Sequence, residues 1–176
     1  AICVQKPNLY FQRFKLQFEE RLKLSQLNYS IIRPTAFFKS LSGQIERVSQ
    51  GKPFVVFDRG INNKFKPISD EDLSKFICQK ILAPASFGKL YIVGGPGPAI
   101  SPKQQGQLLF KCAGKPERFF YVPTSLLKLL IFLISPFCIF SETLRNSKEF
   151  LKIALYYATE SMLYWDDKKK SYSDDF

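Results

Sequence analysis

A lysine shares the apolar face of the helix that the sequence predicts between residues 11 and 22. Phe11, Phe14, Phe18 and Leu22 form an apolar stripe, and Lys15 follows Phe11 by four residues. Side chains four apart lie about 40° from each other around a helix, so Phe11 and Lys15 point the same way. Either the ammonium group turns back to water while its stem covers apolar surface, or a buried site uses its charge.

An apolar strand and an Arg-Pro turn follow this helix. The strand is predicted at residues 29–33, and Pro34 ends it. This order, a helix with a lysine, then a strand, then "RP", resembles the extended or atypical short-chain dehydrogenases. In that superfamily a YxxxK helix precedes a strand that ends over the nicotinamide of the cofactor.

Four segments resemble one family within this superfamily, the divinyl chlorophyllide a 8-vinyl-reductases. They are "AICVQKPNLYFQRFKLQFEERL", "YSIIRPTAFFKSLSGQIERVSQGKPFVVF", "KPISDEDLSKFI" and "GGPGPAISPKQQGQLLF". The resemblance runs from Ala1 to about Tyr164. It implies the carboxyl-terminal, substrate-binding part of an NADPH-dependent enzyme of chlorophyll synthesis, which reduces the C8 vinyl group of divinyl chlorophyllide to ethyl.

The same resemblance implies roles for particular residues. Lys15 matches the superfamily lysine that binds the nicotinamide ribose, and it is the one catalytic residue implied. The turn expected to face the nicotinamide of NADPH consists of Pro34, Thr35 and Ala36. Apolar surface for the flat macrocycle is expected from Phe11, Phe37 and Phe38. Packing in the core is the alternative role for Phe37 and Phe38.

The chain departs from the superfamily pattern at the catalytic tyrosine, where it has Phe11. Phenylalanine has no hydroxyl group to give or take a proton. Tyr10 does not replace it, because adjacent helical residues point about 100° apart. Reduction of a carbon–carbon double bond need not protonate a carbonyl oxygen, so this departure suits a vinyl reductase better than an alcohol dehydrogenase.

A glycine-rich fingerprint for dinucleotide phosphates does not open the chain. The one glycine-rich stretch follows a strand predicted at 89–93, and its third glycine position, counted from Gly95, is Ile100. This stretch is better explained as a turn before a helix that Ser101 caps. We therefore expect the chain to be the carboxyl-terminal part of a longer enzyme and to bind NADPH poorly alone.

Composition indicates one globular domain. The chain has 176 residues, of which 45% are hydrophobic, and a net charge of +11. The basic residues are dispersed and no nucleic-acid-binding motif accompanies them, so no nucleic-acid partner is expected. We expect one domain over residues 1–165, with a cofactor-facing part at 1–36 and a substrate lobe with the remaining sheet at 37–165. Residues 166–176 are expected to form a polar tail.

Cysteine and histidine usage excludes several kinds of site. The four cysteines lack CxxC spacing and the chain has no histidine, which argues against a zinc finger and His-based catalysis. No metal is expected. Buried, reduced thiols indicate a reducing compartment. The family resemblance implies a plastid, or the cytoplasm of a photosynthetic bacterium.

The most apolar stretch, residues 126–140, is too short and too interrupted to cross a bilayer. We expect a buried helix that ends at Ser135, before Pro136. The alternative is an apolar face that makes peripheral contact with a thylakoid or envelope membrane, or with a greasy substrate.

Strands and helices alternate along the whole chain. Helices are predicted at 8–25, 37–50, 102–113 and 143–165, with another opening at Ser69, and further strands at 54–57 and 118–122. This order predicts an α/β fold, the carboxyl-terminal half of a Rossmann-like doubly wound sheet with a smaller helical substrate lobe. Two other hypotheses about its function remain: a non-catalytic NmrA-like cofactor-sensing or scaffold protein, and an inactive fragment.

Overall fold

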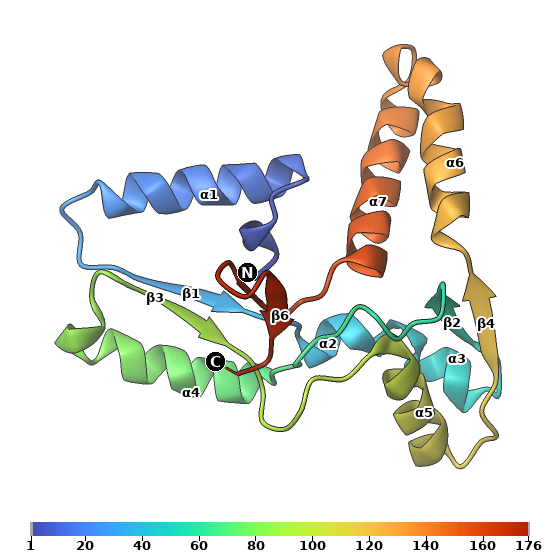
Figure 1. The fold of residues 1–176 in the computed structure, drawn as a ribbon, viewed down its shortest axis with the longest axis horizontal. Helices are drawn as coiled ribbons and strands as arrows, with labels where there is room; N and C mark the ends of the chain where they lie inside the picture. The colour runs from blue at the N-terminus through green and yellow to red at the C-terminus, as the bar shows by residue number, and fades with distance from the viewer. Residues whose placement is uncertain (1, 176) are drawn as a thin grey trace. The chain divides into compact units, whose positions relative to one another are not determined.

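A computed structural model describes residues 2–175. By its internal contacts the chain forms two compact units. Unit 1 is built from three chain segments, 1–43, 65–99 and 162–176, and unit 2 from residues 44–64 and 100–161. Figure 1 traces both units from blue to red along the sequence.

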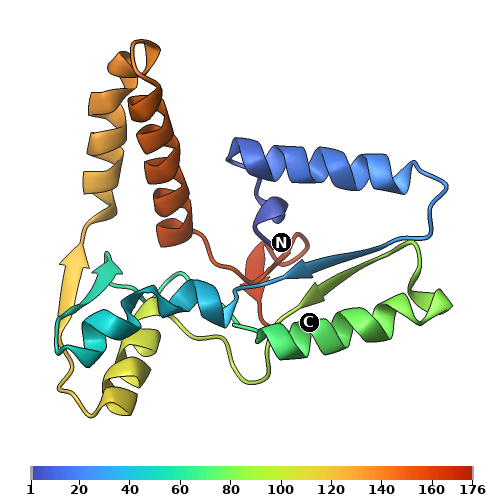
Figure 2. The same ribbon diagram turned by 180° about the vertical axis from the view of Figure 1, so that it is seen from behind.

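Unit 1 is centred on two parallel strands, β1 (Ser30–Pro34) and β3 (Lys89–Val93). Their register pairs Ser30 with Lys89 and Pro34 with Val93, so both strands end at the same edge. Figures 1 and 2 show the strand pair running between α1 (Tyr10–Lys23) and α4 (Asp70–Ile81). A short turn, η1 (Ile2–Gln5), precedes α1, and η3 (Pro84–Ser86) connects α4 to β3.

Two helix starts show how the local sequence sets the boundaries. Ser69 caps α4 as predicted, because its hydroxyl accepts a hydrogen bond from Asp72 N at 3.0 Å. The helix predicted to start at residue 8 begins later, as α1 at Tyr10, with Leu9 at the N-cap position. There the Gln12 side chain accepts a hydrogen bond from Leu9 N at 2.9 Å.

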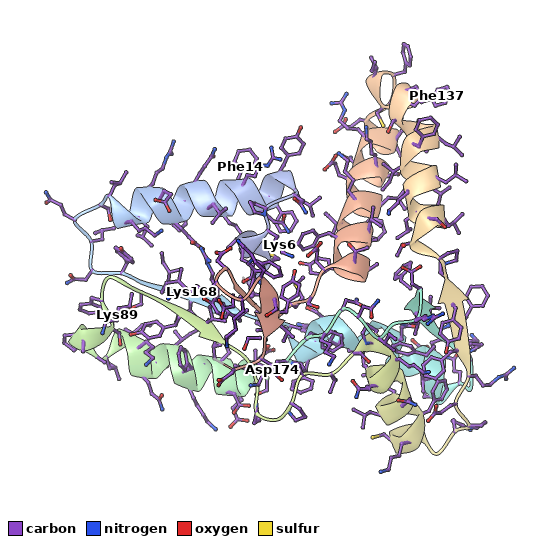
Figure 3. All side chains as sticks on the ribbon, viewed as in Figure 1. Lys6, Phe14, Lys89, Phe137, Lys168 and Asp174 are labelled. Carbon is purple, nitrogen blue, oxygen red and sulfur yellow. The ribbon has the colours of Figure 1, made fainter. Side chains whose placement is uncertain are left out.

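The buried face of α1 is polar, and this corrects an expectation. Phe14 and Phe18 are 65% and 66% exposed, whereas Gln12 and Glu19 are buried. Burying these polar groups is tolerated because Gln12 binds the helix start and Glu19 pairs with Arg33. The predicted apolar stripe therefore faces outward at Phe14, and Figure 3 shows this side chain on the side of α1 away from β1.

A small hairpin completes unit 1. The last helix is shorter than predicted, and β5 (Tyr164–Asp166) pairs antiparallel with β6 (Ser171–Ser173) in the stretch expected to be tail. The rings of Trp165 and Tyr172 lie 5.0 Å apart. Lys6 Nζ lies 3.8 Å from the Trp165 ring centroid, so the hairpin packs on the start of the chain.

Unit 2 has its own core around the parallel strands β2 (Phe54–Phe57) and β4 (Phe119–Val122). The helices α3 (Ile45–Ser49) and α5 (Pro102–Ala113) accompany them. This core consists of Val48, Phe54, Val56 and Phe110, with Phe119 packed against it. The Phe119 ring meets Phe54 and Phe110 edge-on, at 6.1 and 5.8 Å between centroids.

A helical hairpin extends unit 2. It consists of α6 (Thr124–Ile134), the turn η4 (Ser135–Ile139) and α7 (Glu142–Thr159). Asp58, which follows β2, caps α6: its carboxylate accepts hydrogen bonds from Thr124 N and Thr124 Oγ1, both at 2.8 Å. The sequence predicted that α6 is buried, and this is wrong for most of the helix: of its 11 residues, Thr124 and Leu127 are the two that are buried.

The α/β prediction with parallel strands is confirmed. The single helix expected at 37–50 is divided into α2 (Phe38–Leu41), η2 (Ser42–Gln44) and α3. Two of the thiols expected to be buried, Cys78 and Cys112, are exposed. No helix within residues 2–175 is long and apolar enough to cross a membrane.

Candidate functional site

The turn after β1 continues directly from the end of the strand. Thr35 N donates a hydrogen bond to Val93 O at 3.0 Å, and the Thr35 hydroxyl donates to Lys66 O. Pro34 and Thr35 are buried. The Thr35 hydroxyl therefore holds the turn in place rather than projecting toward a ligand.

A second segment, residues 66–68, lies against this turn. Ile68 N donates to Ala36 O at 2.9 Å, and Phe38 N donates to Ile68 O at 3.3 Å. Gly95 packs directly against the same segment: a Cβ atom built at Gly95 would fall 1.9 Å from Pro67 O. Only glycine allows this approach, which explains the glycine after β3 without a phosphate loop.

The turn after β1, the segment 66–68 and Gly95 after β3 meet at the carboxyl edge of the β1–β3 pair. In open α/β sheets, ligands bind in the crevice outside the carboxyl ends of the strands. Ala36 and Phe37 are half-buried there, and Phe38 is 55% exposed. The predicted residues 34–38 thus run along this edge, from the last residue of β1 through the turn to the first residue of α2.

The other two predicted site residues lie together on α1. Lys15 Nζ is 5.5 Å from the centroid of the Phe11 ring. Phe11 is half-buried and Lys15 is exposed, so the reading in which the ammonium is buried is wrong for the chain as described. The aliphatic stem and the ring share one face, and the charge faces solvent, where it can donate hydrogen bonds.

Gln12 is a feature of this helix that the sequence reasoning missed. Its side chain is fully buried, and within the described residues Gln12 Nε2 has no hydrogen-bond partner. An unsatisfied buried amide costs about 1–3 kcal/mol. Gln12 lies one turn from Lys15 on α1, but its side chain is inside the unit whereas the Lys15 side chain is exposed.

The end of the chain also contributes to this edge, which the sequence reasoning missed as well. Lys66 Nζ donates to Asp174 O at 2.7 Å, and Ala99 N donates to Asp174 Oδ2 at 3.2 Å. Asp174 therefore connects the segment at Lys66 to the loop that follows Gly95 and reaches Ala99. Figure 3 labels Asp174. No sequence signal points to these contacts, since they join residues 75 and 108 positions apart.

Within the described residues, no metal cluster marks the edge. Within residues 2–175, no three His, Cys, Asp or Glu side chains gather to hold a metal ion. A cavity of about 370 Å³ lies at the opposite end of β1, beside Ser30 and Phe87. Another of about 500 Å³ lies on α5, beside Gln104 and Lys111.

Comparisons with known proteins give the chain its relatives. No protein-family model matches the sequence. The chain is 44% identical, over 99% of its length, to "Divinyl chlorophyllide a 8-vinyl-reductase, chloroplastic" of Cucumis sativus. It is 43% identical to the proteins of the same name from Zea mays and Arabidopsis thaliana. The chain spans 43–45% of the length of these relatives.

A solved structure shares the fold. A nucleoside-diphosphate-sugar epimerase from Staphylococcus aureus superposes with a TM-score of 0.64, over 95% of this chain and 55% of that one. At 13% identity this likeness shows the fold alone. The resemblance inferred from the sequence is confirmed: the chain is a relative of the divinyl chlorophyllide a 8-vinyl-reductases and corresponds to a carboxyl-terminal part of them, less than half their length.

Proposed function

We propose that this chain is the substrate-binding part of an NADPH-dependent 8-vinyl-reductase that acts on divinyl chlorophyllide in the plastid. The observation that carries the proposal is the 43–44% identity, over 99% of the chain, to four chloroplastic proteins of that name. The carboxyl edge of β1 and β3 supports it, since the turn at 34–38 lies where this fold binds its ligands.

A donor on α1 fits the cofactor. The exposed ammonium of Lys15 supplies hydrogen bonds and positive charge for ribose hydroxyls. NADPH supplies a hydride when bound. The pyrophosphate has no glycine fingerprint in this chain, so we assign its binding to the part of the relatives that this chain does not match.

Apolar side chains fit the substrate. Phe11 stands where the superfamily pattern has a proton-donating tyrosine, and its ring has no hydroxyl group. In this proposal the Phe11 ring excludes water and contacts the macrocycle, and it does not transfer a proton. Phe38, which is 55% exposed beside the half-buried Phe37, offers an aromatic face for stacking on the flat tetrapyrrole. The dispersed net charge of +11 favours a substrate and a cofactor that both carry negative groups.

A chimeric enzyme tests the proposal. The matched 43% of the Cucumis sativus protein is replaced by this chain, and the chimera is expressed in cells that accumulate divinyl chlorophyllide. Pigment chromatography is expected to show the 8-ethyl product. A soluble chimera that leaves only divinyl pigment, beside an active Cucumis sativus protein expressed in the same way, contradicts the proposal and favours a non-catalytic role.

A further inference from the structure

The helical hairpin of unit 2 exposes a concentrated set of large apolar side chains at its far end. We call the set the apolar tip, and it consists of Phe132, Phe137, Ile139 and Phe140. Their exposed fractions are 74%, 58%, 80% and 85%. Figure 3 shows Phe137 at the end of the hairpin, where α6 passes into α7. Exposed apolar side chains gathered in this way mark an interaction site.

Internal packing of the hairpin does not account for the tip. Cys138, between two tip residues, points inward: it is buried, and its Sγ lies 3.2 Å from Ile134 O and 3.6 Å from Leu144 O. Leu127 is the buried leucine of α6. Cys138 and Leu127 therefore lie on the inner side of the hairpin, and the exposed tip residues form an outer surface.

Charges border the tip and are absent from it. Residues 129–141 carry no charged side chain. Exposed Lys128 precedes this stretch, and exposed Glu142, exposed Arg145 and half-buried Lys148 follow it on α7. From residue 124 to 152 there are four basic and two acidic side chains, and one acid, Glu149, is bonded to Lys152 at 2.7 Å. The border of the tip is thus net positive.

We infer that the apolar tip inserts into the interfacial region of an anionic lipid surface, with Lys128, Arg145 and Lys148 at the level of the headgroups. An uncharged aromatic tip with basic residues behind it has the chemistry of a segment that lies in the interface. Basic side chains near an anionic leaflet each add attraction, and their stems reach past apolar surface. With 11 residues, α6 is too short to span the bilayer, so the contact is peripheral.

Vesicle flotation of the 176-residue chain tests the inference. The expected result is flotation with vesicles of phosphatidylcholine and phosphatidylglycerol (70:30), and weaker flotation with phosphatidylcholine alone or at high salt. The double variant Phe137→Ser and Phe140→Ser should lower the partition coefficient between vesicles and water by about tenfold or more. Each substitution removes the favourable free energy of transferring a phenylalanine side chain from water into the lipid. Circular dichroism checks that the variants fold.

A matched control separates the tip from general stickiness. The variant Phe14→Ser and Phe18→Ser removes two phenylalanines of similar exposure, 65% and 66%, from α1. It should float like the unmodified chain. Equal loss in both variants overturns the inference, and so does unchanged flotation of the tip variant.

Two further outcomes also overturn it. One is failure of the unmodified chain to float with anionic vesicles. The other is a concentration-dependent dimer that the tip variant abolishes, which assigns the tip to a second copy of the chain. Replacing Lys128 and Lys148 by glutamine should reduce flotation on anionic vesicles only. None of these results depends on the reductase proposal.

Discussion

The carboxylate of Glu19 on α1 accepts two hydrogen bonds from the guanidinium of Arg33 on β1. Arg33 Nε lies 3.1 Å from Glu19 Oε1, and Nη2 donates to Oε2. The two side chains are only 14% and 10% exposed, for arginine and glutamate respectively. This pair connects the helix that carries Phe11 and Lys15 to the strand that ends at the turn, so it fixes the two parts of the candidate site to each other.

Removing one partner of this pair should destabilise the chain strongly. Arg33→Ala leaves Glu19 buried without its counter-charge, and we expect the free energy of unfolding to fall by about 3 kcal/mol. Urea denaturation followed by circular dichroism measures it. The exposed pair Lys75 and Glu71 is the control, since Lys75→Ala should cost at most about 0.5 kcal/mol. Equal small losses would mean that the Glu19–Arg33 pair does not hold α1.

Gly95→Ala should disturb the carboxyl edge. The added methyl group would lie 1.9 Å from Pro67 O, a backbone atom, so the segments must separate. We expect a loss of about 2–3 kcal/mol in the free energy of unfolding. At Gly43 an added Cβ meets no atom within 4 Å, so Gly43→Ala is the control and should change stability little. A neutral Gly95→Ala contradicts the described packing of the edge.

Phe110→Ala tests the core of unit 2. Phe110 is fully buried against Phe119, and its truncation should cost about 3–5 kcal/mol. Leu108→Ala, two residues earlier on α5, removes a side chain that is 51% exposed and should cost under about 1 kcal/mol. Thermal denaturation of both variants measures the difference. A similar loss in the two would place the buried face of α5 elsewhere.

Local signals in the sequence were sufficient for several elements. The strands at 54–57 and 89–93 and the helix at 102–113 match their predicted bounds. Ser101 caps that helix and Gly114 ends it in the left-handed conformation, with φ +61°. Such helix boundaries depend on hydrogen bonds between backbone groups at the helix end and residues close by in the sequence. A few adjacent residues are therefore enough to predict them.

Features that depend on distant contacts could not be read in this way. The outward face of α1 follows from the pairing of Glu19 with Arg33, and the apolar periodicity of the helix pointed to the opposite face. The strand at 171–173 depends on its pairing with 164–166. The sequence located residues 34–38 of the site, and it missed the contacts of Asp174 at the same edge and the buried side chain of Gln12 on α1.

Lys15→Ala should impair cofactor use in the chimeric enzyme. A charge-assisted hydrogen bond contributes about 1.5–3 kcal/mol, so we expect kcat/KM for NADPH to fall by about tenfold or more. Steady-state kinetics measure it. Lys23→Ala is the matched control, because Lys23 is also exposed on α1 and binds Glu20 at 2.7 Å, and it should leave the constants unchanged. Unchanged constants for Lys15→Ala would remove Lys15 from the site.

Isotope transfer tests the central claim most directly. The purified chimera is incubated with divinyl chlorophyllide and NADPH that carries deuterium in both positions at C4 of the nicotinamide, and the pigment is analysed by mass spectrometry. If this chain forms the substrate-binding part of an 8-vinyl-reductase, the product has an 8-ethyl group with one deuterium. An 8-ethyl product without deuterium, or unchanged divinyl pigment beside an active Cucumis sativus enzyme, would contradict the account.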